Sequence, residues 1–343
     1  LPICCIIKHI AAYTGVSPTT VSNVIHGRSG RVSEETVHKI QDAIEKLGYV
    51  PNMSARSLVS SSSKVIALIN HINTRKDSNF MDDPFQASLI GIIESALREN
   101  GYYLMVRTVD TADELLAFLR NWNVDGLFVT GIFRDSFFDT LSTLDLPMVF
   151  IDSYVKHPNF YNVGLEDFNG SFLATSHLIE NGHRKIAFTS PSIRDGGVLQ
   201  ERFLGYKAAL TQYGIAFDKH LVFEYEMDLP SCRELAKQLT AILDLTGIVA
   251  SADIMAAGIM TGLRDLGVRV PDDLSIVGFD DLVFSQMITP PLTTIHQNMP
   301  LKGQTAVDFM LQKLEGRTLS QTEVILPTYL VKRQSVRNLR NDH

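Results

Sequence analysis

The chain is poor in cysteine and has no long apolar run. Its 343 residues include three cysteines, Cys4, Cys5 and Cys232, and the first two are adjacent. This spacing suits neither a metal site nor a disulfide framework, and it is typical of proteins in a reducing cytosol. No run of 18 apolar residues occurs, which excludes an apolar membrane-spanning helix. We therefore expect a cytoplasmic protein.

The usual catalytic signatures are also missing. The sequence contains no G-x-G-x-x-G opening a helix, no P-loop, no H-E-x-x-H and no G-x-S-x-G. We therefore expect no cofactor, no metal and no enzyme activity. The apolar opening "LPICCII" is short and lacks a basic leader and an A-x-A site. We interpret it as a ragged or misassigned start and not as a signal peptide.

Charge is divided unevenly along the chain. The formal net charge is −7, yet residues 1–64 hold seven Lys/Arg against four acids, a balance of +3. The other 279 residues hold 24 against 34, a balance of −10. This asymmetry fits a small DNA-facing head on an acidic body, although ordinary solvated surfaces produce similar imbalances.

Residues 1–50 have the pattern of three helices. A first helix is expected over 7–14, and Gly15 ends it. In "GVSPTTVSNVIHG", Ser17 is a suitable N-cap and Pro18 a suitable first helical residue. A third helix begins after Ser33 and ends at Gly48. Two short helices joined by a glycine turn and covered by a third predict a small all-α helix-turn-helix head.

The second helix presents an unusual surface. Its apolar residues Val21, Val24 and Ile25 form one stripe, which leaves Pro18, Thr19, Ser22, Asn23 and His26 on the other side. That side is polar but uncharged, and its side chains both donate and accept hydrogen bonds, as base edges require. A capped core helix with no external partner is the alternative.

Residues 51–63 are expected to form a hinge helix and a serine linker. Pro51 breaks the chain, Asn52 can cap a short helix, and Ser60 to Ser63 form a flexible segment. A helix of two turns is unstable alone in water. We expect it to order only against a dimer mate or in a DNA groove.

From residue 64 onwards, apolar β-rich runs alternate with helical patterns. Strands are expected at 65–70, 102–109, 125–131, 147–152, 185–190, 221–226, 247–253 and 274–281, and helices at 84–100, 111–122, 168–181, 198–214, 231–244, 253–267 and 299–315. Continuous Val/Ile/Leu runs between helices predict parallel sheets covered on both faces. About 270 residues exceed one open sheet, so we predict an α/β body of two doubly wound lobes with a ligand crevice at the strand ends.

Five segments in order resemble the lactose/galactose-repressor family of bacterial transcription regulators. They are "GVSPTTVSNVIHG", "VSEETVHKIQDAIEKLGYVPNMSARSL", "GHRKIAF", "GVRVPDDLSIVGFDD" and "PPLTTIHQNMPLKGQTAVDFML". The resemblance covers residues 6 to 335 and implies a homodimer that binds a pseudo-palindromic operator, its body resembling periplasmic sugar-binding proteins. It further implies a first lobe of 64–163 plus about 293–322, and a second lobe of 164–292 plus about 323–338.

The resemblance also implies the DNA contacts. Pro18, Thr19 and Asn23 are expected to read bases, with Asn23 bidentate to adenine, while Tyr13, Thr20 and Ser22 contact the backbone. Pro18 departs from members that carry a hydrogen-bonding residue there and offers only apolar contact. His9 stands where the family commonly has Asp, for which we have no explanation.

In the hinge segment, the resemblance assigns Leu58 as the apolar wedge inserted into the minor groove. Its alternative is packing between the hinge helices of a dimer. Asn52 and Arg56 are assigned to nearby phosphates, although each side chain could equally be solvated.

Effector contacts are implied at seven positions: Asn70, His71, Phe85, Asp152, Arg202, Met227 and Asp280. Carboxylates, a guanidinium and an aromatic ring suit a sugar or a sugar-derived molecule. Asp280 could instead cap a helix, and Arg202 could pair with Glu201 on the surface.

Two departures from the family pattern put the ligand identity in doubt. Ala252 replaces an Asn common in the family, Met227 replaces an aromatic residue, and both changes remove sugar contacts. Arg194 in "SIRDGGV" could meet a phosphate or carboxylate near the mouth, or belong to a solvated loop.

The leading hypothesis is an effector-switched DNA-binding repressor. A carbohydrate-active enzyme is one alternative, because Asp152 and Asp280 could mimic a glycosidase pair, although no acid/base asymmetry is evident. A solute-binding protein is the other alternative, and the expected DNA-binding head argues against it.

Overall fold

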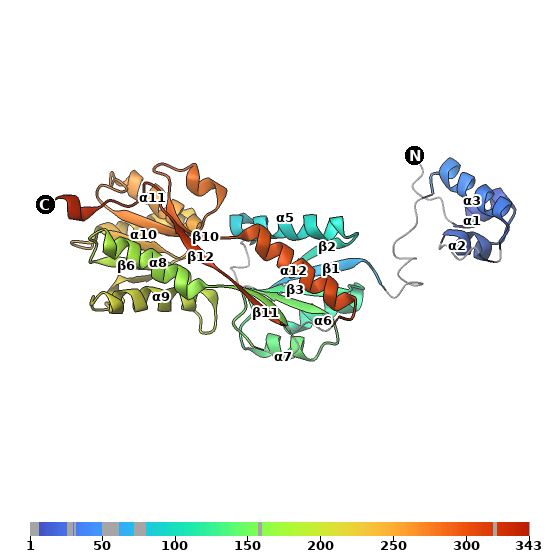
Figure 1. Cartoon of the computed structure of the whole chain (residues 1–343), viewed down its shortest axis with the longest axis horizontal. Helices are drawn as coiled ribbons and strands as arrows, with labels where there is room; N and C mark the ends of the chain where they lie inside the picture. The colour runs from blue at the N-terminus through green and yellow to red at the C-terminus, as the bar shows by residue number, and fades with distance from the viewer. Residues whose placement is uncertain are drawn as a thin grey trace. The chain divides into compact units, whose positions relative to one another are not determined.

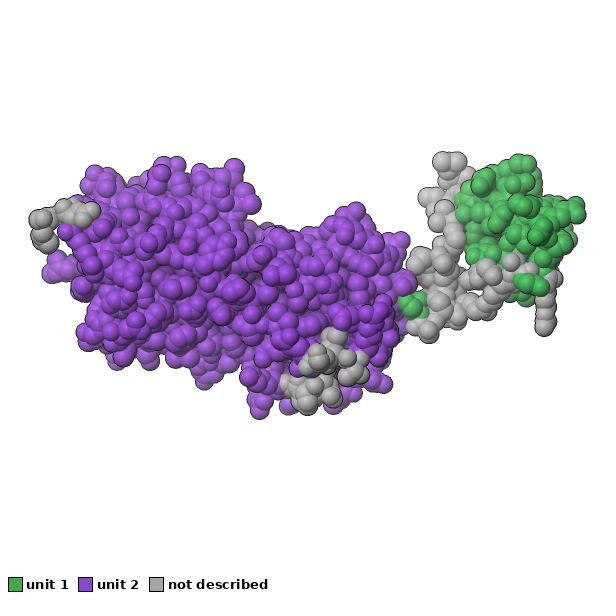
Figure 2. All heavy atoms as spheres, in the orientation of Figure 1, with its two compact units in different colours: residues 1–63 green, residues 64–343 purple. Residues whose placement is uncertain are grey.

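The computed structural model describes residues 7–25, 30, 32–49, 62–71, 80–156, 160–317 and 321–342. The chain divides into two compact units, residues 1–63 and 64–343, coloured separately in Figure 2. The hinge assignments at Asn52, Arg56 and Leu58, and the exposed-face assignment of His26, lie outside the described residues.

The first unit is a three-helix head, as predicted. Its helices are α1 (Ile7–Thr14), α2 (Pro18–Ile25) and α3 (Glu34–Leu47). Ser33 caps α3 by accepting from the Thr36 amide, and Gly48 ends it in the left-handed conformation at φ 60°. Apolar residues from all three helices form one small core, which consists of Ile10, Ala11, Val21, Ile40 and Ala43.

The second unit contains two six-stranded sheets (Figure 1). The first sheet has the order β11-β5-β4-β3-β1-β2, and its neighbouring strands are parallel. Its strands are β1 (Val65–Asn70), β2 (Tyr103–Thr108), β3 (Gly126–Thr130), β4 (Met148–Ile151), β5 (Tyr161–Leu165) and β11 (Glu323–Leu326).

The second sheet has the order β12-β10-β9-β8-β6-β7, and only β12 is antiparallel to its neighbour. Its strands are β6 (Ile186–Ser190), β7 (Val222–Glu224), β8 (Gly247–Ala250), β9 (Ser275–Asp280), β10 (Thr293–Gln297) and β12 (Thr328–Val331).

Helices cover both faces of each sheet, because alternate side chains of every strand point to opposite faces. In β1, Ile66 and Leu68 join one apolar cluster while Ala67 and Ile69 join another. The first lobe has α5 (Pro84–Glu99), α6 (Ala112–Asn121), α7 (Ser136–Ser142) and α12 (Met299–Leu314). Helices α5 and α12 lie side by side on the same face (Figure 1).

The second lobe is built in the same way. Its helices are α8 (Asp167–Glu180), α9 (Val198–Gln212), α10 (Leu229–Thr240) and α11 (Asp253–Asp265). It also contains the short 3-10 helices η2 (Lys219–Leu221), η3 (Val283–Gln286) and η4 (Leu339–Asp342), whereas η1 (Phe80–Asp82) precedes α5 in the first lobe. Helices α8 and α9 share one apolar cluster with the first lobe, whereas α10 and α11 bury a separate cluster. The predicted pair of doubly wound lobes is confirmed.

The chain crosses between the lobes three times, and two crossings correct the expected lobe boundaries. Strand β10 at 293–297 pairs with β9, so this segment lies in the second lobe and not in the first. Strand β11 at 323–326 pairs with β5, so it lies in the first lobe and not in the second. The lobe is decided by backbone pairing, to the preceding strand for β10 and to a strand distant in sequence for β11, which local pattern does not encode.

Candidate functional site

Helix α2 presents the polar surface predicted from its sequence. Val21 is fully buried, Pro18 and Thr19 are exposed, and Ser22 and Asn23 are partly exposed. The Ser17 hydroxyl accepts from the Thr20 amide at 3.1 Å and lies 2.8 Å from the Thr20 hydroxyl. Tyr13 at the end of α1 is 57 % exposed. Among the described residues, the Asn23 amide has no hydrogen bond, so it is available to an external partner.

In the body, polar residues gather where parallel strands end. Asn70 ends β1 and accepts from the Thr130 hydroxyl at 3.4 Å, Asp152 follows β4, and Asp280 ends β9. Asp152 and Asp280 have positive φ values of 54° and 118°. Non-glycine residues in such conformations carry backbone strain, which is concentrated at functional sites.

A buried lysine joins two of these positions, and it was not identified from the sequence. Lys302 on α12 is 1 % exposed. Its ammonium donates to both carboxylate oxygens of Asp152 at 2.7 Å and to Gln297 Oε1 at 2.8 Å. It also lies 5.4 Å from the centre of the Phe85 ring at the start of α5. Three strong acceptors therefore use the three N–H groups of this cation.

The contacts continue through the second lobe. Gln297 Nε2 donates to Asp280 Oδ1 at 2.7 Å, and an Arg202 Nη lies 3.8 Å from the same oxygen. Arg202 Nε donates to Asp167 Oδ1 at 2.8 Å, and the Tyr154 hydroxyl donates to Asp167 Oδ2 at 2.7 Å.

These contacts form a chain that begins and ends in the loop after β4, which we call the interlobe ring. It consists of Asp152, Lys302, Gln297, Asp280, Arg202, Asp167 and Tyr154. Arg202 is buried and pairs with Asp167, so its predicted alternative pairing with surface Glu201 is wrong. Asp280 binds Gln297, and η3 is preceded by Leu282, so its alternative role as a helix cap is also wrong.

Burial sets the ionisation of these carboxyl groups. It raises the pKa of Asp280 to about 7, against the opposing attraction of Arg202. Burial likewise raises the pKa of Asp152, and the nearby Lys302 ammonium opposes this rise. Burial also raises the pKa of Asp83, and hydrogen bonds from backbone amides oppose that rise. Such shifts are typical of functional clefts.

His71 is held rigidly at the end of β1. Its ring stacks on Phe137 with centroids 3.7 Å apart and an interplanar angle of 6°. Its Nδ1 lies 3.0 Å from the Val109 carbonyl oxygen, and its Nε2 lies 3.9 Å from Asp135 Oδ2. The latter aspartate caps α7 and was not identified from the sequence.

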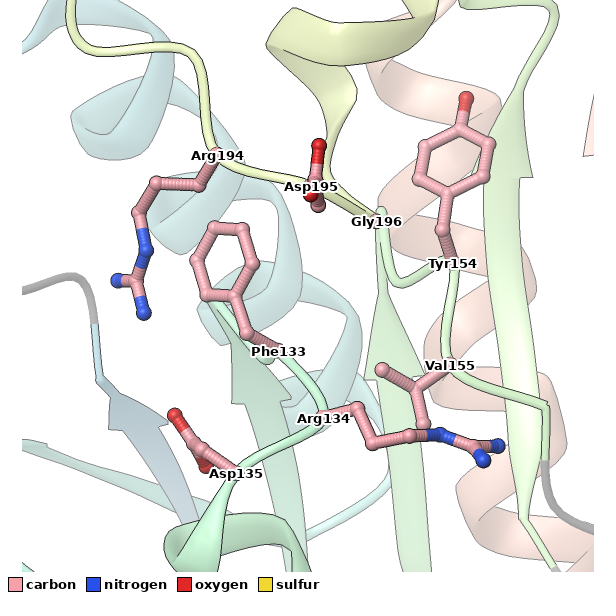
Figure 3. A pocket seen from close by; sticks show the side chains of 8 residues that line it. All are labelled: Phe133, Arg134, Asp135, Tyr154, Val155, Arg194, Asp195 and Gly196. Carbon is pink, nitrogen blue, oxygen red and sulfur yellow. The ribbon is translucent and has the colours of Figure 1, made fainter.

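A cavity of about 430 Å³ opens where loops of both lobes meet (Figure 3). It is lined by Phe133, Arg134, Asp135, Tyr154, Val155, Arg194, Asp195 and Gly196. The Arg194 side chain runs alongside the Phe133 ring, with its guanidinium carbon 3.9 Å from the ring centre. Tyr154 lines this cavity and also belongs to the interlobe ring, so the two features adjoin. The cavity has the size of small-molecule sites.

Met227 and Ala252 are not part of the ring. Met227 packs against the apolar cluster of α10 and α11. Ala252 precedes α11 and gives it no side-chain cap. Within the described ranges, neither residue makes a hydrogen bond to a member of the ring.

The described residues contain neither a membrane-spanning helix nor a cluster of metal ligands. No helix among them is both long enough and apolar enough to cross a membrane. In the same part of the chain, no three His, Cys, Asp or Glu side chains are arranged to hold a metal ion.

Two family models match this chain. Residues 6–52 match the model described as bacterial regulatory proteins, lacI family, and residues 175–336 match the periplasmic binding protein-like domain. The chain is 32 % identical to the HTH-type transcriptional regulator CelR of Thermobifida fusca over 340 residues, 96 % of this chain and 97 % of the relative. It is also 32 % identical to the HTH-type transcriptional repressor PurR of Photobacterium profundum, over 97 % of this chain and 99 % of the relative.

Solved structures agree with these sequence matches. A complex of the regulator CelR with cellobiose aligns with a TM-score of 0.71 and 29 % identity, over 97 % of this chain and 100 % of that one. The Lac repressor dimer bound to operator and an anti-inducer aligns with a TM-score of 0.82 and 26 % identity, over 97 % and 99 %. The chain therefore belongs to the LacI family of bacterial regulatory proteins, as a transcriptional regulator with a helix-turn-helix DNA-binding domain and not an enzyme.

Proposed function

We propose that this regulator is a repressor that binds a pseudo-palindromic operator as a homodimer and responds to a sugar or sugar-derived effector between its lobes. The observation that carries the proposal is the polar, uncharged surface of α2 on a head that matches the family model. The related Lac repressor is a dimer on operator DNA, and two-fold symmetry in a protein calls for two related half-sites. Action on chromosomal DNA places the protein in the bacterial cytoplasm.

In this proposal, α2 enters the major groove. Asn23 reads adenine, Pro18 and Thr19 contact neighbouring base edges, and Tyr13, Thr20 and Ser22 fix the register on the backbone. The assigned roles of Asn52 and Arg56 at phosphates and of Leu58 in the minor groove complete the interface.

The effector enters the crevice beside the interlobe ring. Asp280 and Arg202 are the primary contacts, Phe85 packs against the ligand, and Asn70 and His71 form one wall. The CelR complex contains cellobiose, which supports a carbohydrate for this chain. Both carboxylate oxygens of Asp152 accept hydrogen bonds from Lys302, so the main role of Asp152 is to position that lysine. Met227 packs in the second lobe and contributes to the shape of the site from a distance.

The ring provides a physical route from ligand to DNA. It joins the ends of β4, β9 and β10 with the start of α8, close to two of the crossings between the lobes. A ligand that changes the ring changes the angle between the lobes and thereby the DNA affinity of the dimer. The coupling is reciprocal, so operator and effector alter each other's affinity by the same factor.

Selection of binding sites from random duplex DNA with the full chain tests this proposal. We expect enrichment of a pseudo-palindrome. The affinity of the protein for this site should change when a sugar that the protein binds is added. Enrichment of sites without symmetry contradicts the homodimer, and an affinity unchanged by every sugar that binds contradicts the switch.

A further inference from the structure

A phenylalanine of the first lobe contacts the second lobe at two points. Phe133 lies in the loop between β3 and α7, and Arg194 and Gly197 lie in the loop between β6 and α9. The guanidinium carbon of Arg194 is 3.9 Å from the centre of the Phe133 ring, and Figure 3 shows the two side chains next to each other. At Gly197, an added methyl carbon would lie 2.7 Å from Cε1 of the same ring. Phe133 therefore packs against the side chain of one residue and the backbone of another in the opposite lobe.

Gly197 is explained by this packing and not by its own backbone. Its φ of −123° and ψ of 170° are extended values that any residue adopts. The neighbouring Gly196 differs, because its φ of 74° favours glycine by itself. Around Gly197, the two atoms nearest to an added methyl group belong to the Phe133 ring, and the third is at an ordinary van der Waals distance. The Phe133 ring is thus what leaves no space for a side chain at position 197.

Arg194 is oriented by the same ring. Its guanidinium lies against Phe133, and within the described ranges it has neither a hydrogen bond nor an ion pair. A cation over an aromatic face at an exposed site shifts an equilibrium constant about two- to fivefold. Among the described residues, the polar or ring contact that orients the Arg194 side chain therefore comes from the other lobe.

These contacts lie away from the points where the chain crosses between the lobes. The crossings follow β5, β10 and β11, and with β12 these strands form one edge of the two sheets. In the first sheet β4 separates β3 from β5, and in the second sheet β9 and β8 separate β6 from β10. With neighbouring strands about 4.8 Å apart, the Phe133 loop begins about 10 Å from β5 and the Arg194 loop about 14 Å from β10. A rotation of the lobes about the crossings therefore separates Phe133 from Arg194 and Gly197.

Phe133 and Arg194 also line the cavity of about 430 Å³ (Figure 3). We propose that Phe133, Arg194 and Gly197 form an interlobe latch that holds the two lobes closed over this cavity. An effector in the cavity enters or leaves only when the latch opens. The latch itself follows from the contacts between the lobes, whereas its connection to effector and operator rests on the proposed function.

Hydrogen exchange of the full chain, without added ligand, tests the latch from both sides. Gly197→Ala adds one methyl group in the second lobe, and we expect the amides of 131–135 in the first lobe to exchange about two- to fivefold faster. Phe133→Ala should in the same way accelerate the exchange of 191–197 in the second lobe. Mass spectrometry of peptides that cover the two loops measures both effects, which a purely local role of either residue does not produce.

Two matched variants serve as controls. Gly91→Ala adds a methyl group on α5 that has no atom within 4 Å of it. Phe217→Ala removes a ring that is 40 % exposed and whose described ring contacts, with Phe203 and Lys207, lie within its own lobe. Neither control is expected to change the exchange of either loop.

Urea unfolding of Phe133→Ala, Arg194→Ala and the double variant is a second test. Because the two side chains touch, we expect their effects to be coupled by about two- to fivefold in the unfolding equilibrium constant. Phe217→Ala combined with Arg194→Ala should show no such coupling.

Two results overturn the latch. One is exchange that is unchanged, or faster only in the lobe that carries the substitution, and the other is independent effects of Phe133→Ala and Arg194→Ala on unfolding. Operator affinity is measured on the same samples. If it is unchanged while exchange in the opposite lobe is faster, the latch stands and the proposed coupling of lobe closure to DNA is rejected. If the wild type binds no operator, the proposed regulator is rejected and the exchange results still decide the latch.

Discussion

At the scale of single residues, Asn23 is expected to contribute most to the discrimination between DNA bases. Its amide is partly exposed on α2 and, among the described residues, has no internal partner. Asn23→Ala is expected to reduce discrimination at one base pair per half-site by about 1–3 kcal/mol, the usual value of a bidentate contact. Binding to a set of single-base operator variants measures this. Gln41→Ala, at an exposed position of α3, is the control, and unchanged discrimination in Asn23→Ala shows that the assigned face is incorrect.

Asp280 makes the stability of the body depend on pH. Its folded pKa of about 7 lies well above the ordinary value of 3.8, so ionisation is unfavourable in the fold. The free energy of unfolding should therefore fall as the pH rises through about 7, because the folded state holds the proton that the unfolded state has lost.

Asp280→Asn removes this contribution, so the decline between pH 6 and pH 8 should be shallower in the variant than in the wild type. Urea unfolding at several pH values provides the comparison. Identical slopes for both proteins mean that Asp280 does not titrate in this range.

The sequence predicted several site residues but missed their partners. Asp152, Asp280 and Asn70 follow apolar strands, and parallel strands bring such ends to one edge. Lys302 and Gln297 were missed because a lysine in an amphipathic helix is ordinarily exposed, and nothing local shows that α12 turns it inward. Asp83 and Asp135 were missed because each also has an ordinary role as a helix cap.

At the scale of elements, the backbones of α8 and α9 approach each other closely at Gly205 of α9. A methyl group at this residue would lie 2.1 Å from the Phe168 carbonyl oxygen. Gly205→Ala is expected to destabilise the second lobe by about 1–3 kcal/mol, as other overpacked sites are. Gly91 on α5 is exposed with no atom near such a methyl group, so Gly91→Ala should instead stabilise the protein by about 0.5–1 kcal/mol. Urea unfolding of both variants tests the pair, and equal shifts contradict the close approach.

Lys302 connects α12 to the ends of β4 and β10. Lys302→Met leaves Asp152 buried without its cation, which is expected to cost about 3–5 kcal/mol of stability. The double variant Lys302→Met with Asp152→Asn should recover most of this loss, because no unpaired charge remains. Unfolding free energies of the two single variants and the double variant measure the coupling, and additive losses contradict a direct pair.

Strand topology was the least predictable element property. The expected strands at 65–70 and 185–190 are confirmed, because continuous apolar residues are buried on both faces. Strands β5, β10, β11 and β12 and helix α7 were not predicted, since they are short and contain polar residues. The strands with which they pair decide which lobe they join, and this moved the boundaries at 293 and 323.

For the molecule as a whole, the basic head and acidic body have separate tasks. Residues 1–64 carry +3 and the remaining residues −10, so DNA attraction belongs to the head. The interlobe ring and the adjoining cavity lie in the body. In the proposed function, ligand and DNA therefore bind to different units, and their effects on each other pass through the proposed dimer and the hinge segment.

The most direct test of DNA reading by α2 is the affinity of the full chain for its selected operator, measured over a range of salt concentrations. We expect tight binding at low salt and a linear fall of log affinity with log salt, with a slope of about −0.9 for each phosphate contacted. We also expect the selected site to be bound more tightly than a scrambled duplex at every concentration. Absence of binding to any duplex at low ionic strength contradicts the central claim that the surface of α2 reads DNA.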